Sequence, residues 1–539
     1  MSGTFLGTRR GEHLLEWACL LAIMGLAAYL RLANLPGNPG WYSDEGTVAE
    51  IAKNFGQGRN QYFALVHSIL LTGRVPLFPL LVAGFSRLGI EGLPAARYLA
   101  ACFSLVSGLL VFAMGKSVLE RQGAALGLLA ALLFAIYPQA VLYNRMGFTY
   151  NLLSPLILGM VLGLWHYLQS GKRVWLGLAS VLIGVSTVTD LTSLSFLVVM
   201  ALVVSAVRWR DLLWSLPLSL SPLMVYSAGM LLQAPGAFLF DLRFTLPRFS
   251  AIPWWGQFAL VIANLAAVGK EDPWFLPSVV GMFLLRPPRW QRLLLVMFLG
   301  PMFFLGRTTA LAGHQQYHMI PFFPFLAFGA AGLLWVGVPT VLDTLRRGIA
   351  DLLAAWGLGR RGERARWVQA RLSVIGAALG LFAIGMSPFV VPFFATLGQV
   401  RTGFQSSISH LVVDAEDAKQ VIAYLNDSST VDALTLASPS IGWALDGRVA
   451  DFQLAVAATG RAPNDFPGDI PPDRFAFDAR LQAADRVVID PIWVNWAAIF
   501  IPEVTEMVQV VQTWPLVFQA GEIKVFQNPD KSTLSAGQD

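Results

Sequence analysis

Charged residues are scarce in this chain: they make up 13% of its 539 residues, whereas apolar residues make up 55%. About a quarter of the residues of a soluble domain are usually charged. This scarcity, together with a mean hydropathy of +0.58, excludes an ordinary soluble protein. Cysteine is scarce as well. Cys19 and Cys102 both lie in apolar segments, which favours buried small hydrophobes over a disulfide, and no Cys/His spacing typical of a metal site occurs.

The excess of positive charge is missing from the last quarter of the chain. Residues 1–400 hold 29 Lys and Arg against 15 Asp and Glu, while residues 401–539 hold 9 against 18. No clustered basic face occurs, which excludes nucleic acid as a partner. Arg9 and Arg10 precede an apolar run, but no small-residue cleavage site follows. We therefore interpret this run as a retained first helix and not as a signal peptide.

Long apolar runs dominate the first 400 residues. A transmembrane helix needs about 20 predominantly apolar residues, and the first such run covers 14–32. Further spans are predicted at roughly 95–115, 123–142, 150–168, 174–189, 191–207, 212–232, 273–285, 293–306, 317–338 and 373–395. The predicted fold class is therefore an α-helical polytopic membrane protein with about 11 transmembrane helices, in a range of 11–13.

The basic residues orient these spans, because cytoplasmic loops carry an excess of Lys and Arg. Lys116, Lys172, Arg208, Arg286 and an Arg-rich segment at 343–372 all fall in loops on one side. We therefore predict a plasma (inner) membrane protein with a cytoplasmic N-terminus. The outer loops are then 33–94, which contains interfacial helices, 143–149, 189–190, 233–272, 307–316 and everything beyond 396. The prolines and paired tryptophans of 233–272 predict an irregular interfacial segment.

The chain changes character near residue 400, which divides it into a membrane domain at 1–400 and an extracytoplasmic α/β domain at 401–530. Apolar residues at helical spacing from Ala415 to Leu425 predict an amphipathic helix. Segments 431–437 and 486–489 are typical of short strands, and 516–519 with 522–526 of a hairpin. The polar terminus at 531–539 is predicted to be disordered.

Two adjacent carboxylates, Asp44 and Glu45, follow the first span in the sequence Trp-Tyr-Ser-Asp-Glu-Gly. They could simply begin a helix, where acidic residues favour capping and the helix dipole. Alternatively, Asp44 is a general base that removes a proton from an acceptor, with Glu45 tuning or orienting it. Carboxylates beside lipid are costly and are usually retained for a role, which favours the catalytic interpretation.

Several other polar residues are predicted on the same side of the membrane. Arg74, Arg97 and Arg145 could extend to the lipid headgroups, or their guanidinium groups could bind a phosphate. His314, Tyr317 and His318 lie together before a late span. They could bind a phosphate or sugar, pack at the interface or, through the two histidines, hold a metal. A divalent ion on Asp44 and Glu45 also stays open, because hard cations need only oxygen ligands.

The order of these pieces resembles the polyprenyl-phosphate-dependent glycosyltransferases with the C-type fold, above all the protein O-mannosyltransferases and the aminoarabinose lipid A transferases. Residues 41–45 resemble the acidic first loop of that superfamily, and 74–78 resemble its stretch of a basic residue followed by Pro-Pro-Leu. Residues 317–321 resemble the loop before a late span. The chain departs from the pattern at Val75, which replaces the first proline, and near Asn144, where an acidic residue is often found.

The resemblance implies transfer of one sugar from a polyprenyl-phosphate donor to a protein hydroxyl, lipid or glycan on the outer face of the membrane. It implies inversion at the sugar, a mannosyltransferase-like activity in the cell envelope such as protein glycosylation, Asp44 as catalytic base and Arg74 as ligand of the lipid phosphate. No cofactor is required by this chemistry. Two alternatives remain: a multispan transporter, and a non-catalytic receptor or assembly subunit with an outer binding domain.

Overall fold

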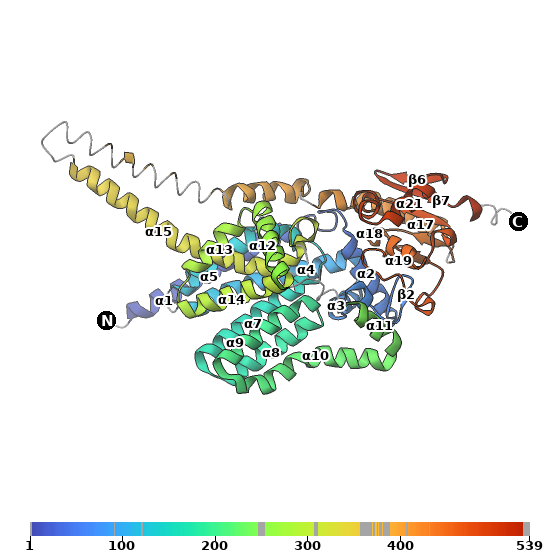
Figure 1. Cartoon of the computed structure of the whole chain (residues 1–539). Coiled ribbons are helices and arrows are strands. Elements are labelled where there is room, and N and C mark those ends of the chain that lie inside the picture. Colours follow the sequence, from blue (N-terminus) through green and yellow to red (C-terminus); the bar gives the residue numbers. More distant parts are fainter. Residues whose placement is uncertain are drawn as a thin grey trace.

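The computed structural model describes residues 3–90, 92–119, 122–245, 254–306, 311–355, 389–405, 408–430 and 432–531, with isolated positions between 356 and 388. Three predictions lie wholly or partly outside these residues: the polar terminus at 531–539 beyond residue 531, half of the Arg-rich loop at 343–372 and about half of the span at 373–395. Figure 1 shows an elongated molecule with a helical bundle at the N-terminal end and a mixed domain at the other end.

The bundle is built from ten helices of the described chain. They are α1 (Gly3–Leu32), α4 (Gly92–Val118), α5 (Gly123–Ile136), α7 (Tyr150–Ser170), α8 (Arg173–Thr187), α9 (Leu194–Arg208), α10 (Leu212–Gln233), α13 (Phe275–Leu284), α14 (Pro288–Leu305) and α15 (Phe323–Ala355). Five described segments are long and apolar enough to cross a membrane: His13–Leu32, Gly92–Val118, Tyr150–Ser170, Leu191–Gln233 and Gln315–Val336. The count of eleven spans therefore stays a prediction.

Two helices of the bundle approach each other at glycine. A Cβ atom added to Gly281 of α13 would lie 1.9 Å from the carbonyl oxygen of Gly329 in α15. Such close backbone contact is typical of helices packed in lipid. Lipid supplies no hydrophobic driving force between helices, and small residues let the backbones approach closely enough for van der Waals packing to hold them together. The predicted span at 123–142 is interrupted, since α5 ends at Ile136 and a short α6 (Pro138–Tyr143) begins at a proline.

Loops that the sequence places on opposite sides of the membrane lie at opposite ends of the bundle. At one end, Arg173 and Arg208 both pair with the buried Asp211, so the predicted inner loops meet there. At the other end, the Thr149 hydroxyl donates to Asp190 at 3.2 Å, which joins two predicted outer loops. Which end faces the cytoplasm stays a prediction from the basic residues.

An outer layer covers this second end of the bundle (Figure 1). It contains α2 (Ser43–Gly56), the strand pair β1 (Gln61–Tyr62) and β2 (Leu65–Val66), the short helix η1 (Leu70–Thr72) and α3 (Leu77–Ser86). The prediction that 233–272 is irregular was wrong for the described residues of that segment, which form α11 (Pro235–Thr245) and α12 (Trp254–Glu271). Pro235 begins α11 and the paired tryptophans begin α12, and a proline at a helix start does not interrupt backbone hydrogen bonds.

The C-terminal domain, residues 408–531, contains a five-stranded sheet in the order β4-β3-β5-β7-β6. Its strands are β3 (Leu434–Leu436), β4 (Arg448–Ala450), β5 (Arg486–Ile489), β6 (Leu516–Ala520) and β7 (Ile523–Gln527). The strands β4, β3 and β5 are parallel, while β7 and β6 continue the sheet antiparallel as a hairpin. The predicted strand at 486–489, the hairpin and the amphipathic helix, α17 (Ala415–Ser428), are confirmed.

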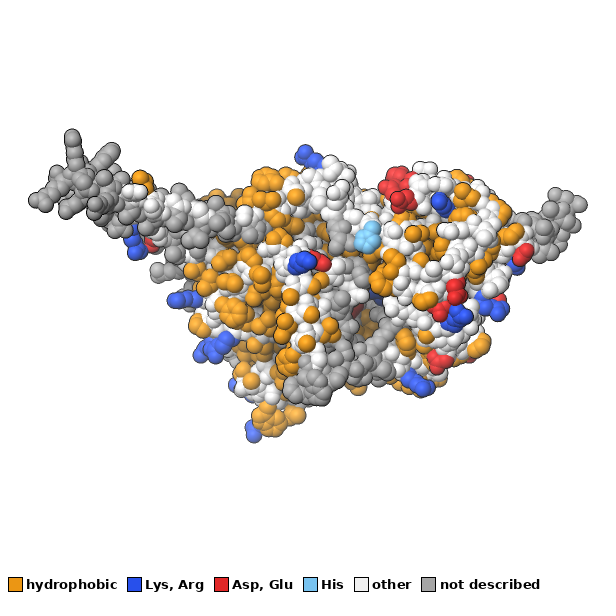
Figure 2. Space-filling view, turned by 45° about the horizontal axis from the view of Figure 1, so that its top comes forward, with side chains coloured by type: hydrophobic (Ala, Val, Ile, Leu, Met, Phe, Trp, Pro, Cys, Tyr) orange, Lys and Arg blue, Asp and Glu red, His pale blue; other side chains and the backbone are white. Residues whose placement is uncertain are grey.

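The C-terminal domain is joined to the outer layer by backbone bonds. Trp41 and Val413 exchange both of their N–H···O bonds, at 2.7 and 2.9 Å, and the Ala476 N–H donates to Ala64 at 2.8 Å. Acidic and basic side chains gather on this domain in Figure 2, whereas apolar side chains cover much of the bundle. The two parts therefore differ in surface yet form one continuous packed structure.

Candidate functional site

Asp44 lies in the first turn of α2 and forms an ion pair with Arg74. The Nη2 atom of Arg74 is 3.0 Å from Oδ2 of Asp44, and the Asp44 side chain is 29% exposed. Arg74 follows Gly73, whose φ of 72° is a conformation that glycine adopts without strain and that ends η1. This turn directs the arginine back towards the start of α2, so two segments 30 positions apart meet at one point.

Arg74 keeps unused hydrogen-bonding capacity. Its side chain is 10% exposed, and its Nε atom has no hydrogen-bond partner among the described residues. Burial opposes its charge, but the nearby Asp44, Tyr150 and Tyr317 together raise the pKa of Arg74 above its ordinary value. It is therefore a fixed cation with N–H groups available to an anionic ligand.

A cavity of about 350 Å³ surrounds this ion pair. The side of the bundle supplies Tyr150, Gln315, Tyr317 and His318 to its lining. Tyr150 and Tyr317 stack with ring centroids 5.7 Å apart, and His318 lies 5.0 Å from Tyr150 with its Nδ1 atom 2.9 Å from the Gln315 carbonyl oxygen. Tyr317 and His318 therefore lie where the sequence predicts them. The side chain of His314 lies outside the described residues.

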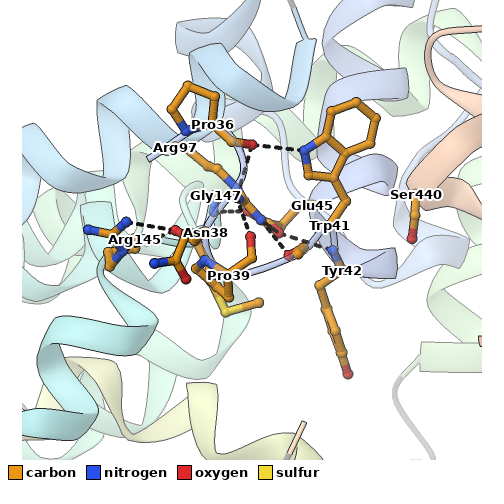
Figure 3. A network of polar contacts seen from close by, with 12 residues as sticks. Pro36, Asn38, Pro39, Trp41, Tyr42, Glu45, Arg97, Arg145, Gly147 and Ser440 are labelled. Atoms are coloured by element: carbon orange, nitrogen blue, oxygen red, sulfur yellow. Dashed lines mark hydrogen bonds and ion pairs between the residues drawn. The ribbon is translucent and has the colours of Figure 1, made fainter. Parts of the chain in front are cut away.

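Glu45 points away from this cavity although it adjoins Asp44 in sequence. It is fully buried and accepts hydrogen bonds from Nε and Nη2 of Arg97, at 2.8 and 2.6 Å, and from the Gly147 N–H at 2.6 Å (Figure 3). It also accepts the Tyr42 N–H at 3.2 Å, which caps α2. Glu45 therefore has the helix-capping role that the sequence allowed, whereas the Asp44 side chain lines the cavity.

Arg97 and Arg145 hold the loop that leads from α1 to Asp44. Besides Glu45, Arg97 donates to carbonyl oxygens of residues 35, 36, 39 and 40. Arg145 donates to those of Leu30, Ala33 and Asn38 at 2.6 to 3.1 Å (Figure 3). Neither lines the cavity, because a buried loop with unpaired carbonyl groups needs internal donors. The structure therefore does not bring these two arginines to Asp44 and Arg74.

The C-terminal domain forms the remaining wall of the cavity, with Pro439, Asp451, Phe452, Gln453, Asp465 and Phe466. Sequence reasoning missed all six of these residues, and nothing local distinguishes five of them. Asp190 also contributes to the electrostatic environment of Arg74, and sequence reasoning did not assign it to the site. One signal was available: Asp451 follows a short apolar segment, as acids do at the ends of parallel strands.

An apolar groove of about 430 Å³ adjoins the cavity. Its lining includes Leu70 and Val75, which flank Thr72 and Arg74 of the cavity, and continues over Leu194, Leu223 and Phe238 of the bundle and α11. The segment 70–75 therefore borders an apolar groove on one side and a charged cavity on the other. This arrangement fits an amphiphile whose polar head is an anion.

Solved structures with the same arrangement of helices exist. ArnT from Cupriavidus metallidurans bound to undecaprenyl phosphate matches with a TM-score of 0.61 at 14% identity, over 96% of this chain and 98% of that chain. The fold is that of the C-type glycosyltransferases. The apo form of ArnT gives a TM-score of 0.58 with the same identity and coverage. The C-type fold class, predicted from the sequence, is therefore confirmed.

A more distant structure has the C-type fold as well. The archaeal oligosaccharyltransferase AglB from Archaeoglobus fulgidus, in complex with an inhibitory peptide and a dolichol-phosphate, matches with a TM-score of 0.50 at 12% identity, over 92% of this chain and 72% of that chain. No family model matches the chain, and no curated protein matches it by sequence. The fold is thus recognised from the structure alone. Sequence identities of 12–14% do not establish the activity, which is argued from the site.

The two adjacent carboxylates do not fit a shared divalent ion. Asp44 faces Arg74, whereas both oxygens of Glu45 accept hydrogen bonds from other groups. Within the part of the chain that the structure describes, no group of three or more His, Cys, Asp and Glu side chains is placed to hold a metal. Asp44 is therefore paired with the cation Arg74, and Asp44 and Glu45 are not arranged to share a metal ion.

Proposed function

We propose that this protein is a membrane glycosyltransferase that moves one sugar from a polyprenyl-phosphate donor to an acceptor hydroxyl or amine at the outer face of the membrane. The observation that supports this most directly is the Asp44–Arg74 pair, which lies where an apolar groove meets a polar cavity. A lipid chain in the groove would bring its phosphate to Arg74 and its sugar into the cavity.

Asp44 and Arg74 would share the chemistry of one displacement. The Asp44 carboxylate takes the proton of the acceptor while the acceptor oxygen or nitrogen bonds to the anomeric carbon. The bond from that carbon to the phosphate oxygen breaks at the same time, and the polyprenyl phosphate leaves with the electron pair. Arg74 stabilises the charge that develops on the phosphate. A single in-line displacement inverts the configuration of the sugar.

The ion pair also links the base to the phosphate site. The guanidinium of Arg74 lies 3.0 Å from the Asp44 carboxylate and holds it in place before the donor binds. When a phosphate takes up N–H groups of Arg74, the hold of Arg74 on Asp44 weakens, and the carboxylate can turn towards the acceptor.

The solved relatives support the donor class. The ArnT structure holds undecaprenyl phosphate and the AglB structure a dolichol-phosphate, both lipid phosphates with long isoprenoid chains. The multi-pass plasma membrane location with an extracytoplasmic C-terminal domain is part of the same proposal. Mannose as the sugar, and a protein, lipid or glycan as the acceptor, remain predictions.

Purified full-length protein, given undecaprenyl-phosphate-linked sugars and a mixed panel of acceptors, tests this function. We expect sugar transfer by the wild type and a loss of about 10²–10⁴-fold in kcat for Asp44→Asn, the usual contribution of a general base. The matched control is Asp469→Asn, a change of the same type at an exposed position of the C-terminal domain. Equal transfer by wild type and Asp44→Asn would contradict the proposal and favour a transporter or a non-catalytic subunit.

A further inference from the structure

The C-terminal domain presents the carboxyl edge of its parallel strands to the cavity. Pro439 follows β3 by three residues, and Asp451 follows β4 directly; both line the cavity. In α/β sheets this edge is the common place for ligands, because the loops and helix N-termini there point their N–H groups and side chains outward. The domain therefore faces Asp44 with the part of its fold that is best suited to binding.

Glycine allows this edge to come close to the base. A Cβ atom added to Gly46, two residues after Asp44, would lie 1.9 Å from the Pro439 carbonyl oxygen. The backbones of α2 and α18 (Pro439–Gly442) are therefore in direct contact. Lys53 of α2 adds bonds to the carbonyl oxygens of Trp443 and Leu445, at 3.3 and 2.8 Å. The wall is thus fixed in position relative to Asp44.

Asp465 in this wall is held in one orientation by Gln453. The Gln453 amide donates to Oδ2 of Asp465 at 2.8 Å, and its oxygen accepts the Asp465 N–H at 2.9 Å. Gln453 is 9% exposed, so the pair is built into the edge of the domain. The charge of Asp465 is also near Tyr42, whose pKa rises through burial and the carboxylates Asp44 and Asp465. This carboxylate therefore belongs electrostatically to the site.

Asp451 adds a second acid to the same wall. Its Oδ2 atom accepts a hydrogen bond from the buried Tyr62 hydroxyl, and its Oδ1 atom accepts the Leu454 N–H at 2.7 Å. The cavity is thus divided by charge, with the cation Arg74 at the groove and two acids at the opposite domain. A phosphate is expected to bind at the Arg74 end of the cavity, and a group with hydrogen-bond donors at the end with the two acids.

We propose that Asp465, oriented by Gln453, accepts a hydrogen bond from a hydroxyl or amino group of the donor's sugar, and that the acidic wall discriminates against sugars that carry a carboxylate. This inference rests on the proposed function. The phosphate at Arg74 fixes the start of the sugar, and a cavity of about 350 Å³ is near the small end of ligand sites. A sugar attached to that phosphate therefore reaches the wall of the C-terminal domain.

The test measures binding of undecaprenyl phosphate to the full-length protein, first bare and then carrying a neutral hexose, a hexosamine or a hexuronic acid. We expect Asp465→Asn to bind bare undecaprenyl phosphate like the wild type, which also reports that the variant is folded. Its affinity for the preferred sugar-bearing lipid should fall by about tenfold or more, the effect of losing one hydrogen bond to a charged group. The wild type should bind the hexuronic acid form weakest, and Asp465→Asn should narrow that difference.

The outcomes separate this inference from the function on which it rests. Unchanged affinity of Asp465→Asn for every sugar-bearing lipid, with discrimination against the hexuronic acid retained, overturns the subsite and leaves the donor class intact. If the wild type binds no sugar-bearing lipid, the donor class and the subsite fall together. The control Asp469→Asn, in the same loop but exposed, should match the wild type with every lipid. An equal loss in both variants would also overturn the specific role of Asp465.

Discussion

Arg74 lies 3.0 Å from Asp44, although the two residues come from separate elements of the outer layer. Asp44 is partly exposed to a cavity, whereas its neighbour Glu45 is fully buried against Arg97. Adjacent carboxylates thus have opposite environments: Asp44 faces a cavity, and Glu45 holds a loop. This division gives each acid its own test.

Two substitutions of Arg74 separate the effect of its charge from the effect of its planar N–H groups on phosphate binding. Arg74→Lys keeps the cation but loses the planar set of N–H groups, so we expect weaker binding of undecaprenyl phosphate, with some affinity retained. Arg74→Ala should lose most of it. Titration of each variant with bare undecaprenyl phosphate checks this order. The exposed Arg480, which pairs only with Asp478 among the described residues, provides the control Arg480→Lys. Equal affinity of Arg74→Ala and wild type would remove Arg74 from the phosphate site.

Breaking the buried pair of Glu45 and Arg97 should affect stability more than chemistry. Glu45→Gln leaves the Arg97 charge buried without its counterion, which typically costs about 3–5 kcal/mol of folding free energy. Thermal unfolding should show a clear decrease in Tm. Because Glu45 does not reach the cavity, kcat per folded molecule should fall far less than for Asp44→Asn. A stable Glu45→Gln protein with the kcat of Asp44→Asn would instead assign Glu45 to the reaction.

Gly46 should be essential for docking of the C-terminal domain. Gly46→Ala places a methyl group against the Pro439 carbonyl, and neither backbone can move away freely. We expect loss of stability and of sugar transfer together. Gly56→Ala is the matched control, since it lies in the same helix with no atom within 4 Å of the added carbon. Limited proteolysis between the two domains would report the separation, and a Gly46→Ala protein as resistant as Gly56→Ala would contradict the close contact.

Asp451 predicts a pH dependence of stability. Burial raises the pKa of Asp451 from 3.8 to about 6 in the folded protein, so the folded state binds its proton more tightly than the unfolded state. The stabilisation that this proton gives is complete below about pH 4 and is lost as the pH rises through about 6, a difference of roughly 3 kcal/mol. The wild type should therefore lose stability relative to Asp451→Asn between these pH values.

Thermal unfolding from pH 4 to pH 7.5 measures this difference. Burial raises the pKa of Asp490 to about 6 as well, but Asp490 is present in both proteins and cancels in the comparison. Asp469→Asn should follow the wild type at every pH. A constant difference in Tm between wild type and Asp451→Asn across the range would mean that Asp451 does not titrate there.

The sequence alone determined the fold class and singled out the acid that we propose as the base. Apolar runs are sufficient to predict membrane helices, because lipid leaves the backbone few alternatives. The pattern around Asp44 and Arg74, with the resemblance that it carries, predicted the C-type fold and the two residues that form the ion pair. The strand at 486–489 and the hairpin were also predictable, because alternating apolar residues and turn residues are local signals.

Only the tertiary structure decided which charged residues share the site. Asp44 and Glu45 have the same chemistry and adjoin each other, yet their side chains leave the helix in different directions and meet different partners. Arg97 and Arg145 resemble Arg74 in sequence, but they bind the carbonyl groups of a buried loop. Gln453 and Asp465 lie more than 400 positions from Asp44 and reach its cavity because the C-terminal domain docks with its strand edge against α2. Such contacts depend on packing between distant segments, and no local pattern encodes them.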